Sequence, residues 1–331
     1  MQAAIHTQYG APESLTVGEA PIPSVGADQV VVRVFASPVT QGDRHVRAAD
    51  FPGIGWLPGR LMMGLLRPKN RVPGGNFAGR VVEVGADVTR FAVGDDVFGA
   101  CDSGAQAEFV AVKAEGAIAK MPAGVRYDEI ADAPYGAGTA VTFLEKLAEL
   151  GAGERVLILG ASGGVGRAAV QIAKARGAEV TGVASAAKAD LVRALGADHV
   201  LDYRAVDPTT GDRRYDVVFD TAGRIGFRQV RRVLARRGRF LTTRLSASIL
   251  FWMLLTKLFG ARRALFGLAL PDAALVERVR ALFEAGALRP VIDQRFPLTR
   301  IAQAHVRVES GAARGSVVIT LAEPEPLRVA A

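Results

Sequence analysis

The sequence predicts an α/β protein of two domains, a barrel-like β domain and a doubly wound parallel sheet. Three observations predict this architecture. A chain of 331 residues has room for two domains at about 100–200 residues each. Its first part consists of short β-branched runs broken by Gly and Pro, which favours a barrel over a parallel sheet. From residue 126 onward, apolar strands alternate with helical patterns, as in parallel βα units.

The β-rich part contains two clear strand patterns, at residues 30–35 and 79–85, and the second is closed by Gly at each end. Residues 91–99 have the turn chemistry of a hairpin. We expect the C-terminal tail to contribute to this domain as well, with a helix at 273–286 followed by a closing strand at 317–320.

The alternating part predicts strands at 156–159, 180–183, 200–201, 217–219 and 239–241. Helices are expected at 141–150, 167–176, 187–195 and 227–236. The last of these carries a cluster of arginines with helical spacing, which we interpret as a solvated helix face: Arg228, Arg231, Arg232, Arg236, Arg237 and Arg239.

Composition narrows the class of protein. Half of the residues are hydrophobic and 22% are charged, which is typical of a soluble protein with a large core. The net charge of +8 calls for a check of nucleic-acid and membrane partners, but the basic residues are scattered and no nucleic-acid motif accompanies them. The single cysteine, Cys101, is expected in the core rather than as a nucleophile. Residues 1–5 lack a signal-peptide pattern, so we expect a cytoplasmic protein.

A glycine-rich turn is the most specific motif, and it follows an apolar strand and opens an amphipathic helix. Glycine allows close approach of the backbone to a pyrophosphate, and the helix N-terminus offers free N–H groups. We therefore predict that a dinucleotide binds there, with Ala161 in place of the usual first glycine of the fingerprint. The predicted contacts are Gly160, Ser162, Gly163, Gly164, Val165 and Gly166.

The end of the second strand of this unit favours NADPH over NADH. Residues 181–189 contain no acid, although NAD-binding enzymes place one there for the ribose 2′-hydroxyl. Ser185 and Lys188 instead offer a hydroxyl and an ammonium group to a 2′-phosphate. An ordinary exposed helix lysine is the alternative interpretation of Lys188.

The turn at 160–166, together with residues 169–174 and 195–203, resembles the medium-chain dehydrogenase/reductase superfamily. Within it, the chain is most similar to the zinc-independent quinone oxidoreductases, the zeta-crystallin-like branch. The resemblance implies a GroES-like β-barrel domain from residues 1–125 with 271–331, and a Rossmann domain at 126–270. It also implies an active site in the cleft between them. We further expect a homodimer, a small hydrophobic quinone or enone as substrate, and no nucleic-acid partner.

The same resemblance implies roles for individual residues. Thr40 and Asp43 frame the nicotinamide, and His45 and Arg47 fall on the substrate side of that loop. Thr139 corresponds to a threonine that contacts the cofactor, and Tyr203 to a tyrosine near the adenosine phosphate. The expected carboxyl edge of the fourth strand adds three further cofactor contacts, Thr221, Ala222 and Gly223.

A catalytic zinc is not expected. The positions that correspond to the zinc ligands of related alcohol dehydrogenases are Thr40, Gly75 and Tyr135, and none of the three retains a usual ligand. Without zinc, an acceptor whose reduced form is a delocalised anion is favoured, with Thr40, His45 and Arg47 as candidate donors to the oxyanion. We therefore predict hydride transfer from NADPH to a quinone or an activated alkene. The alternatives are an NADP-dependent alcohol dehydrogenase or carbonyl reductase, and a non-catalytic NADPH-binding sensor or membrane-surface protein.

Two segments are unusually apolar, residues 51–66 and 246–259. The uncharged run at 246–256 is shorter than the roughly 20 residues that a membrane span needs. We expect both segments to line a broad apolar acceptor pocket. A dimer interface and a peripheral contact with a membrane surface are the alternatives.

Overall fold

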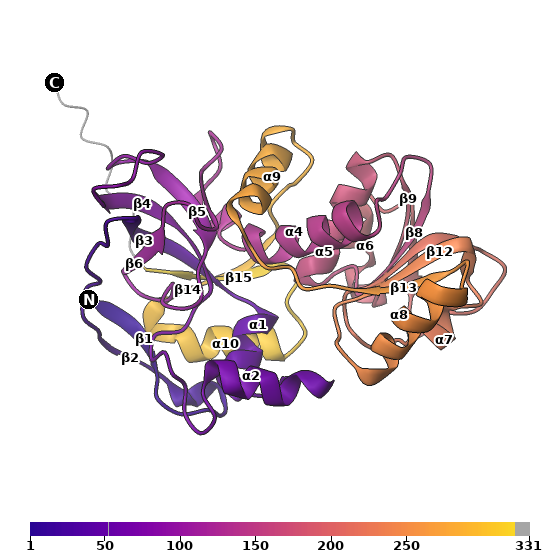
Figure 1. Ribbon diagram of the computed structural model, residues 1–331, viewed down its shortest axis with the longest axis horizontal. Coiled ribbons are helices and arrows are strands. Elements are labelled where there is room, and N and C mark those ends of the chain that lie inside the picture. The colour runs from indigo at the N-terminus through magenta and orange to yellow at the C-terminus, as the bar shows by residue number, and fades with distance from the viewer. Residues whose placement is uncertain (52, 322–331) are drawn as a thin grey trace.

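The computed structural model describes residues 1–51 and 53–321 and has the predicted two-domain α/β fold (Figure 1). A β-rich body at the left of Figure 1 faces a parallel sheet with its helices at the right. Pro52, in the first apolar segment, and residues 322–331, at the end of the predicted β-domain tail, lie outside the described residues.

The β domain is built on a seven-stranded sheet, in which every pairing is antiparallel except that of β14 with β15. Its path is β14-β15-β3-β4-β5-β7, with β6 paired to β3. The strands are β3 (Gln29–Val39), β4 (Asn76–Val84), β5 (Asp96–Ala100), β6 (Phe109–Lys113), β7 (Ile118–Lys120), β14 (Ile292–Pro297) and β15 (Ser316–Thr320). A separate pair, β1 (Gln2–His6) and β2 (Leu15–Glu19), lies beside it.

β3 pairs with β4 along one edge and with β6 along the other, and its register with β4 shifts twice. Such bulges bend a strand. Its alternate residues Val30, Val32 and Val34 are fully buried in one core. The C-terminal strand β15 pairs with the other end of β3, from Val317 opposite Val39 to Thr320 opposite Ala36. The tail of the chain therefore closes the sheet that the N-terminal part begins.

The second sheet is parallel throughout, in the order β10-β9-β8-β11-β12-β13. Its strands are β8 (Arg155–Leu159), β9 (Glu179–Ala184), β10 (His199–Asp202), β11 (Tyr215–Asp220), β12 (Leu234–Thr242) and β13 (Arg263–Phe266). In β8, Val156 and Ile158 face one core and Leu157 and Leu159 face the other, so the strand reads as a continuous apolar run. The strand order reverses between β8 and β11, which is where an open α/β sheet binds ligands.

The helices complete both domains and their connection. They are α1 (Gln41–Ala48), α2 (Trp56–Met63), α3 (Tyr127–Ile130), α4 (Ala133–Val141), α5 (Gly164–Ala175), α6 (Ala189–Ala194), α7 (Phe227–Val230), α8 (Ala247–Phe259), α9 (Ala273–Glu284) and α10 (Ile301–Glu309). Short 3₁₀ turns occur at Pro12–Ser14, Gly53–Gly55, Ala186–Lys188 and Leu298–Arg300. In the described part of the chain, no helix is long and apolar enough to cross a membrane.

Two helix predictions were wrong in extent. The helix predicted at 227–236 ends at Val230, because Val233 and Leu234 are buried at the start of β12; the arginine cluster therefore lies on a helical turn, a loop and a strand. The helix predicted at 141–150 is instead α4, continued by a π-helical stretch at Thr142–Leu147. Glycines at 136 and 138 lower the helix propensity of α4, but the close packing that they allow compensates for this. Strand β13 was not predicted.

Candidate nucleotide-binding and active site

The turn between β8 and α5 has the conformation that close approach to a phosphate requires. Gly160 has φ +77°, and a Cβ there would lie 2.9 Å from Oγ1 of Thr221. A Cβ at Gly166 would lie 2.1 Å from the carbonyl oxygen of Gly160, so α5 begins directly against the turn. Gly163 is the N-cap residue, and Ser162, Gly163, Gly164 and Val165 remain accessible at the helix N-terminus. This geometry fits a pyrophosphate.

The neighbouring strand ends bring together residues for the adenosine part of a dinucleotide. Asp202 of β10 is opposite Ala184 of β9, and the amide of Tyr203 donates to the carbonyl of Ala184 at 3.4 Å. Tyr203 therefore lies next to Ser185, which follows Ala184. The exposed guanidinium of Arg204 lies 5.8 Å from the centre of the Tyr203 ring. Sequence reasoning missed Arg204, because only the strand pairing brings Tyr203, which Arg204 follows, to the end of β9.

Lys188 has protein partners of its own. Its Nζ donates to the carbonyl oxygens of Gly311 at 2.8 Å and Ala313 at 2.7 Å, in the loop before β15. Burial, and then the nearby Arg167, lower the pKa of this ammonium. An ammonium has three N–H donors, so one remains for a further acceptor such as a phosphate.

The hydrogen-bonded side chains of Thr40 and Asp43 form a polar group at the N-terminus of α1. Thr40 and Asp43 form a capping box: the amide of Asp43 donates to Thr40 Oγ1 at 3.1 Å, and the amide of Thr40 donates to the Asp43 carboxylate at 2.8 Å. The hydroxyl of Thr40 also donates to Asp43, at 2.6 Å. Because a hydroxyl has a single proton, the expected role of Thr40 as a donor to substrate is not available in this arrangement. Burial raises the pKa of Asp43, the hydrogen bonds from Thr40 oppose this, and the charge of Asp132 adds to it.

Tyr135 of α4 packs against the same group. A Cβ at Gly42 would lie 3.3 Å both from Oγ1 of Thr40 and from Cε2 of Tyr135, so the tyrosine ring covers the start of α1. Burial, followed by the carboxylates of Asp43 and Asp132, raises the pKa of Tyr135 to about 12. The phenol is therefore protonated at neutral pH and able to donate a hydrogen bond. Sequence reasoning considered this residue only as a lost zinc position.

The three positions that correspond to zinc ligands do not fit a metal. Thr40 and Tyr135 meet across Gly42, whereas Gly75 contributes only backbone, and its carbonyl accepts from the amide of Cys101 at 2.9 Å. Burial raises the pKa of Cys101 to about 12, so this half-buried thiol is protonated at neutral pH and is not an activated nucleophile. Within residues 1–51 and 53–321, no group of three His, Cys, Asp or Glu side chains could hold a metal ion.

Two predicted catalytic residues have partners within the protein. Arg47 is 2% exposed; it donates to the carbonyl of Gly10 at 2.9 Å and forms an ion pair with Glu309 of α10. The prediction that Arg47 faces substrate was therefore wrong, because α10 packs on α1 and supplies an acid from 262 residues away. His45 is held at the far end of α1, where Nδ1 lies 2.9 Å from the carboxylate of Asp50.

The remaining predicted cofactor residues lie at the carboxyl edge of the parallel sheet or on α4. Thr139 donates to the carbonyl of Tyr135 at 2.7 Å, and Thr221 to that of Leu159 at 2.8 Å. The buried carboxylate of Asp220 accepts from the amides of Ala222 and Ile225, which fixes the loop that contains Gly223. These hydrogen bonds fix the loops at the carboxyl edge of the parallel sheet. They use the protons of both threonine hydroxyls, which can then only accept hydrogen bonds from a ligand.

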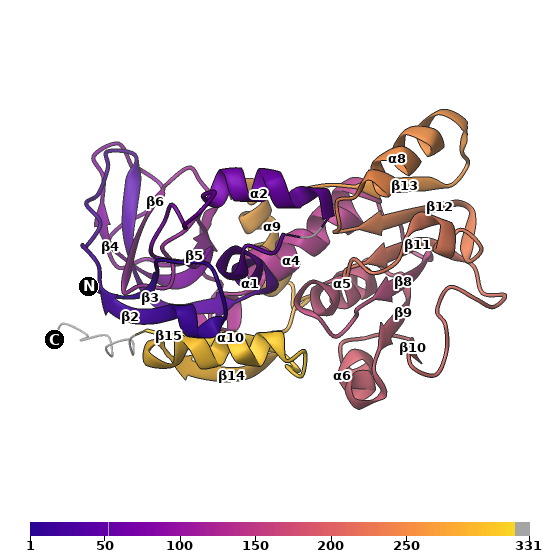
Figure 2. The same cartoon turned by 90° about the horizontal axis from the view of Figure 1, so that it is seen from below.

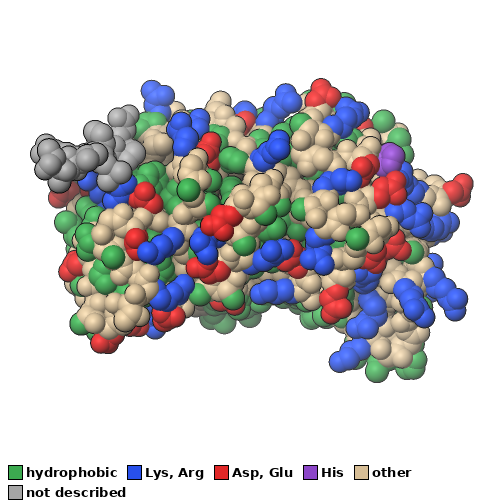
Figure 3. Space-filling view, turned by 90° about the horizontal axis from the view of Figure 1, so that it is seen from above, with side chains coloured by type: hydrophobic (Ala, Val, Ile, Leu, Met, Phe, Trp, Pro, Cys, Tyr) green, Lys and Arg blue, Asp and Glu red, His purple; other side chains and the backbone are tan. Residues whose placement is uncertain are grey.

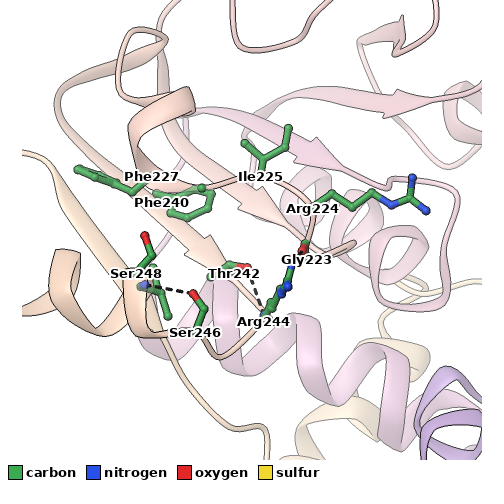
Figure 4. Close-up of a pocket in the computed structure, with 11 residues that line it drawn as sticks. Gly223, Arg224, Ile225, Phe227, Phe240, Thr242, Arg244, Ser246 and Ser248 are labelled. Carbon is green, nitrogen blue, oxygen red and sulfur yellow. Dashed lines mark hydrogen bonds between the residues drawn. The ribbon is translucent and has the colours of Figure 1, made fainter. Parts of the chain in front are cut away.

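A cavity of about 110 Å³ opens beside this loop, at the carboxyl ends of β11 and β12 (Figure 4). Figure 4 shows Phe227 and Phe240 on one side and Ser246 and Ser248 on another, with the guanidinium of Arg224 pointing away. No described residue of 51–66 lines it, and the second apolar segment contributes Ser246, Ser248 and Ile249. This cavity is therefore not the broad apolar pocket that we expected the two segments to line together.

Helix α4 links the two halves of the site. A Cβ at Gly136 would lie 3.2 Å from the carbonyl oxygen of Gly164, so α4 touches the N-terminus of α5. The adjacent Tyr135 contacts the start of α1. One rigid helix thus places a protonated phenol between the glycine turn and the β domain. The parallel sheet carries the glycine turn at the point where its strand order reverses, and the β domain brings Thr40 and Asp43 toward it. This combination defines the class of two-domain, dinucleotide-binding oxidoreductases.

Comparisons with known proteins agree with this class. Residues 26–123 match the alcohol dehydrogenase GroES-like domain, and residues 195–319 match a domain described as zinc-binding dehydrogenase. A chloroplastic quinone-oxidoreductase homolog of Spinacia oleracea is 32% identical over 96% of this chain and 98% of its own length. The NADPH-dependent alkenal/one oxidoreductase of Arabidopsis thaliana is 29% identical over 96% of this chain and 79% of its own.

Among solved structures, the quinone oxidoreductase from Coxiella burnetii superposes with a TM-score of 0.85 at 27% identity, covering 97% of this chain and 99% of that one. The chain therefore belongs to the medium-chain dehydrogenase/reductase superfamily, in its quinone oxidoreductase branch, and is an oxidoreductase.

Proposed function

We propose that the protein is an NADPH-dependent, zinc-independent oxidoreductase that reduces a quinone or an activated alkene. The observation that carries this proposal is the position of Tyr135, whose helix contacts both the glycine turn and the capping box of α1. The names of two relatives support the acceptor class, since one is a quinone-oxidoreductase homolog and the other an alkenal/one oxidoreductase.

The chain holds the cofactor with backbone at one end and side chains at the other. The amides at the start of α5 bind the pyrophosphate, and Ser185, Tyr203 and Arg204 receive the 2′-phosphate of the adenosine. Lys188 contributes its remaining N–H donor. A carboxylate at this strand end would repel the phosphate, and residues 181–189 contain none. When bound, the reduced nicotinamide supplies a hydride.

Tyr135 stabilises the negative charge that develops on the acceptor oxygen. Its phenol stays protonated because burial and two nearby carboxylates hold its pKa at about 12. An enone or a quinone delocalises the added charge, so a hydrogen-bond donor suffices where an unactivated ketone would need a Lewis acid. Thr40 and Asp43 position the start of α1 against the tyrosine ring.

The test is NADPH oxidation by the wild type, Tyr135→Phe and Tyr127→Phe over a panel of quinones, alkenals, ketones and alcohols. Tyr127 is a matched control, because its pKa is also raised to about 12 but its hydroxyl donates to Asp96 of β5 at 2.6 Å. We expect kcat of Tyr135→Phe to fall roughly 10- to 100-fold with quinones or alkenals, with little change for Tyr127→Phe. Treatment with a chelator should leave the activity intact.

Other outcomes would favour the rival functions. Alcohol-dependent reduction of NADP that a chelator abolishes would identify a zinc alcohol dehydrogenase. Tight binding of NADPH without turnover of any acceptor in the panel would identify a sensor. Equal activity of Tyr135→Phe and the wild type would remove Tyr135 from the mechanism while leaving the acceptor class intact.

A further inference from the structure

Two helices expose most of the large hydrophobic side chains on the surface. Of the twenty such side chains that the described structure exposes, fourteen lie in residues 54–66 or 250–270. These segments carry α2 and α8, and together they form what we call the apolar face. Monomeric soluble proteins rarely expose a large contiguous apolar patch unless it binds something.

Helix α8 is apolar on two opposite sides. Its inner stripe, which includes Ile249, Trp252 and Met253, packs onto the core beneath β12 and β13. Its outer stripe, Leu250, Leu254 and Leu258, repeats every four residues and is 45–62% exposed. A globular helix normally presents charged and polar residues at these outer positions, and an all-round apolar helix is normally covered. Nothing in the described part of the chain covers this stripe.

Helix α2 extends the apolar face across the domain boundary. It buries none of its residues, and Trp56, Leu61 and Met62 are each about half exposed or more. Tyr9 anchors it, donating to the carbonyl of Gly64 at 2.7 Å. At its start, a Cβ at Gly53 would lie 2.7 Å from the carbonyl oxygen of Leu245, two residues before α8 begins. Figure 2 shows α2 and α8 on the same side of the molecule.

The two stretches of sequence that carry these helices contain basic residues and no acidic ones. Residues 51–82 contain five Lys or Arg and no Asp or Glu, and residues 221–271 contain eleven and none. The rest of the chain has 25 basic and 33 acidic residues, so the positive charge of the protein comes from these two stretches. In Figure 3, Lys and Arg side chains surround hydrophobic ones on the lobe at the lower right, the end that carries α8.

We propose that the apolar face docks on the surface of an anionic phospholipid bilayer. Exposed leucines and a tryptophan insert at the headgroup boundary, and the flanking basic side chains meet the lipid phosphates. Helices of 8 and 13 residues are too short to span a bilayer, so they lie in its plane. A symmetric contact with a second copy is disfavoured, because residues 51–82 and 221–271 contain basic and no acidic side chains, so two surfaces of the same sign would face each other.

The two tryptophans of the chain report directly on this docking, because Trp56 lies on α2 and Trp252 on α8. We would mix the protein with vesicles of phosphatidylcholine alone and of phosphatidylcholine with phosphatidylglycerol. The expected results are co-flotation with the anionic vesicles, a blue shift of fluorescence, and quenching of Trp56 by brominated lipids in Trp252→Phe. Binding should fall several-fold at high salt.

Leu254→Glu and Val93→Glu separate specific docking from general adsorption of a basic protein. The two side chains are 62% and 66% exposed, and each change adds one negative charge, but Val93 lies in the turn before β5, outside the apolar face. We expect Leu254→Glu to lower vesicle partitioning about tenfold, and Val93→Glu to lower it about twofold or less. Vesicle binding needs no turnover, so this result is independent of the proposed oxidoreductase activity.

Three outcomes would overturn the proposal. The wild type could fail to bind anionic vesicles, or both glutamate variants could lose binding equally. Leu254→Glu could also convert a dimer into monomers in sedimentation analysis while the wild type shows no shift of tryptophan fluorescence with vesicles, which would make the apolar face a subunit interface.

Discussion

At the scale of single residues, the placement of protons decides which side chains can act. Thr40 and Thr139 are the residue types that a donor role requires, yet each donates its single hydroxyl proton within the protein, to Asp43 and to the Tyr135 carbonyl. Tyr135 was named only for lacking a zinc-binding group, and burial keeps its proton in place. Residue types therefore identified the region of the candidate site, while the hydrogen bonds decided which of its side chains can donate a proton to a ligand.

Lys188→Glu should weaken NADPH binding roughly 10- to 100-fold and leave NADH binding nearly unchanged. The reason is that the replacement puts a negative charge where we place the 2′-phosphate. Equilibrium titration of both cofactors measures the effect, with Lys188→Met as a second variant. If both variants weaken NADH and NADPH equally, Lys188 serves only to hold the loop at Gly311 and Ala313.

At the scale of secondary-structure elements, the periodic segments were predictable and the irregular ones were not. The strand at 156–159 and the helix that follows could be predicted, because the spacing of apolar residues and the glycine-rich turn between them indicate the same two elements. The true length of α7 and the strand β13 could not, because four residues carry too little periodicity. Helix α4 was obscured by its glycines, whose purpose is a close approach to α5 that no local pattern reveals.

Gly166→Ala should destabilise the protein by about 1–3 kcal/mol or more, because its Cβ would lie 2.1 Å from a backbone carbonyl that cannot move away. Gly164→Ala is the matched control in the same turn, since only the Asp132 carboxylate lies within 4.0 Å of the added Cβ. Urea unfolding monitored by circular dichroism would compare the two. Equal stability of both variants would show that α5 does not begin tightly against the turn.

At the scale of the whole molecule, the return of the chain to its first domain has the largest consequences. Helix α10 packs on α1 and places Glu309 beside Arg47, and it buries His305 in the same region. Both ring nitrogens of His305 are buried without a partner among the described residues. Burial, followed by the charges of Arg47 and His6, lowers the pKa of His305 to about 3.

This buried histidine predicts a loss of stability in mild acid. The unfolded chain takes up a proton on His305 below its ordinary pKa of 6.5, whereas the folded protein does so only near 3. Its contribution is therefore complete above pH 6.5 and is lost as the pH falls toward 3, at up to about 1.4 kcal/mol per pH unit. His6, whose pKa burial also lowers, acts in the same direction.

Urea unfolding near neutral pH and near pH 5 would measure this loss, which we expect to be about 2 kcal/mol for the wild type. His305→Leu should reduce the difference, and the exposed His199→Gln should retain it. An unchanged pH dependence in His305→Leu would assign the acid sensitivity to other groups. The predicted homodimer and cytoplasmic location concern the whole molecule as well, and both stay predictions.

The sequence by itself determined the class of the fold, the position of the dinucleotide turn and the resemblance to quinone oxidoreductases. These depend on local period and on glycines within one short segment, so neighbours in sequence carry the information. Only the tertiary structure decided that Arg47 is a buried ion-pair partner, that Tyr203 lies next to Ser185, and that Tyr135 meets Thr40. Each of these contacts joins elements far apart in the chain through strand pairing or helix packing, and side-chain protonation then follows from burial that no local pattern specifies.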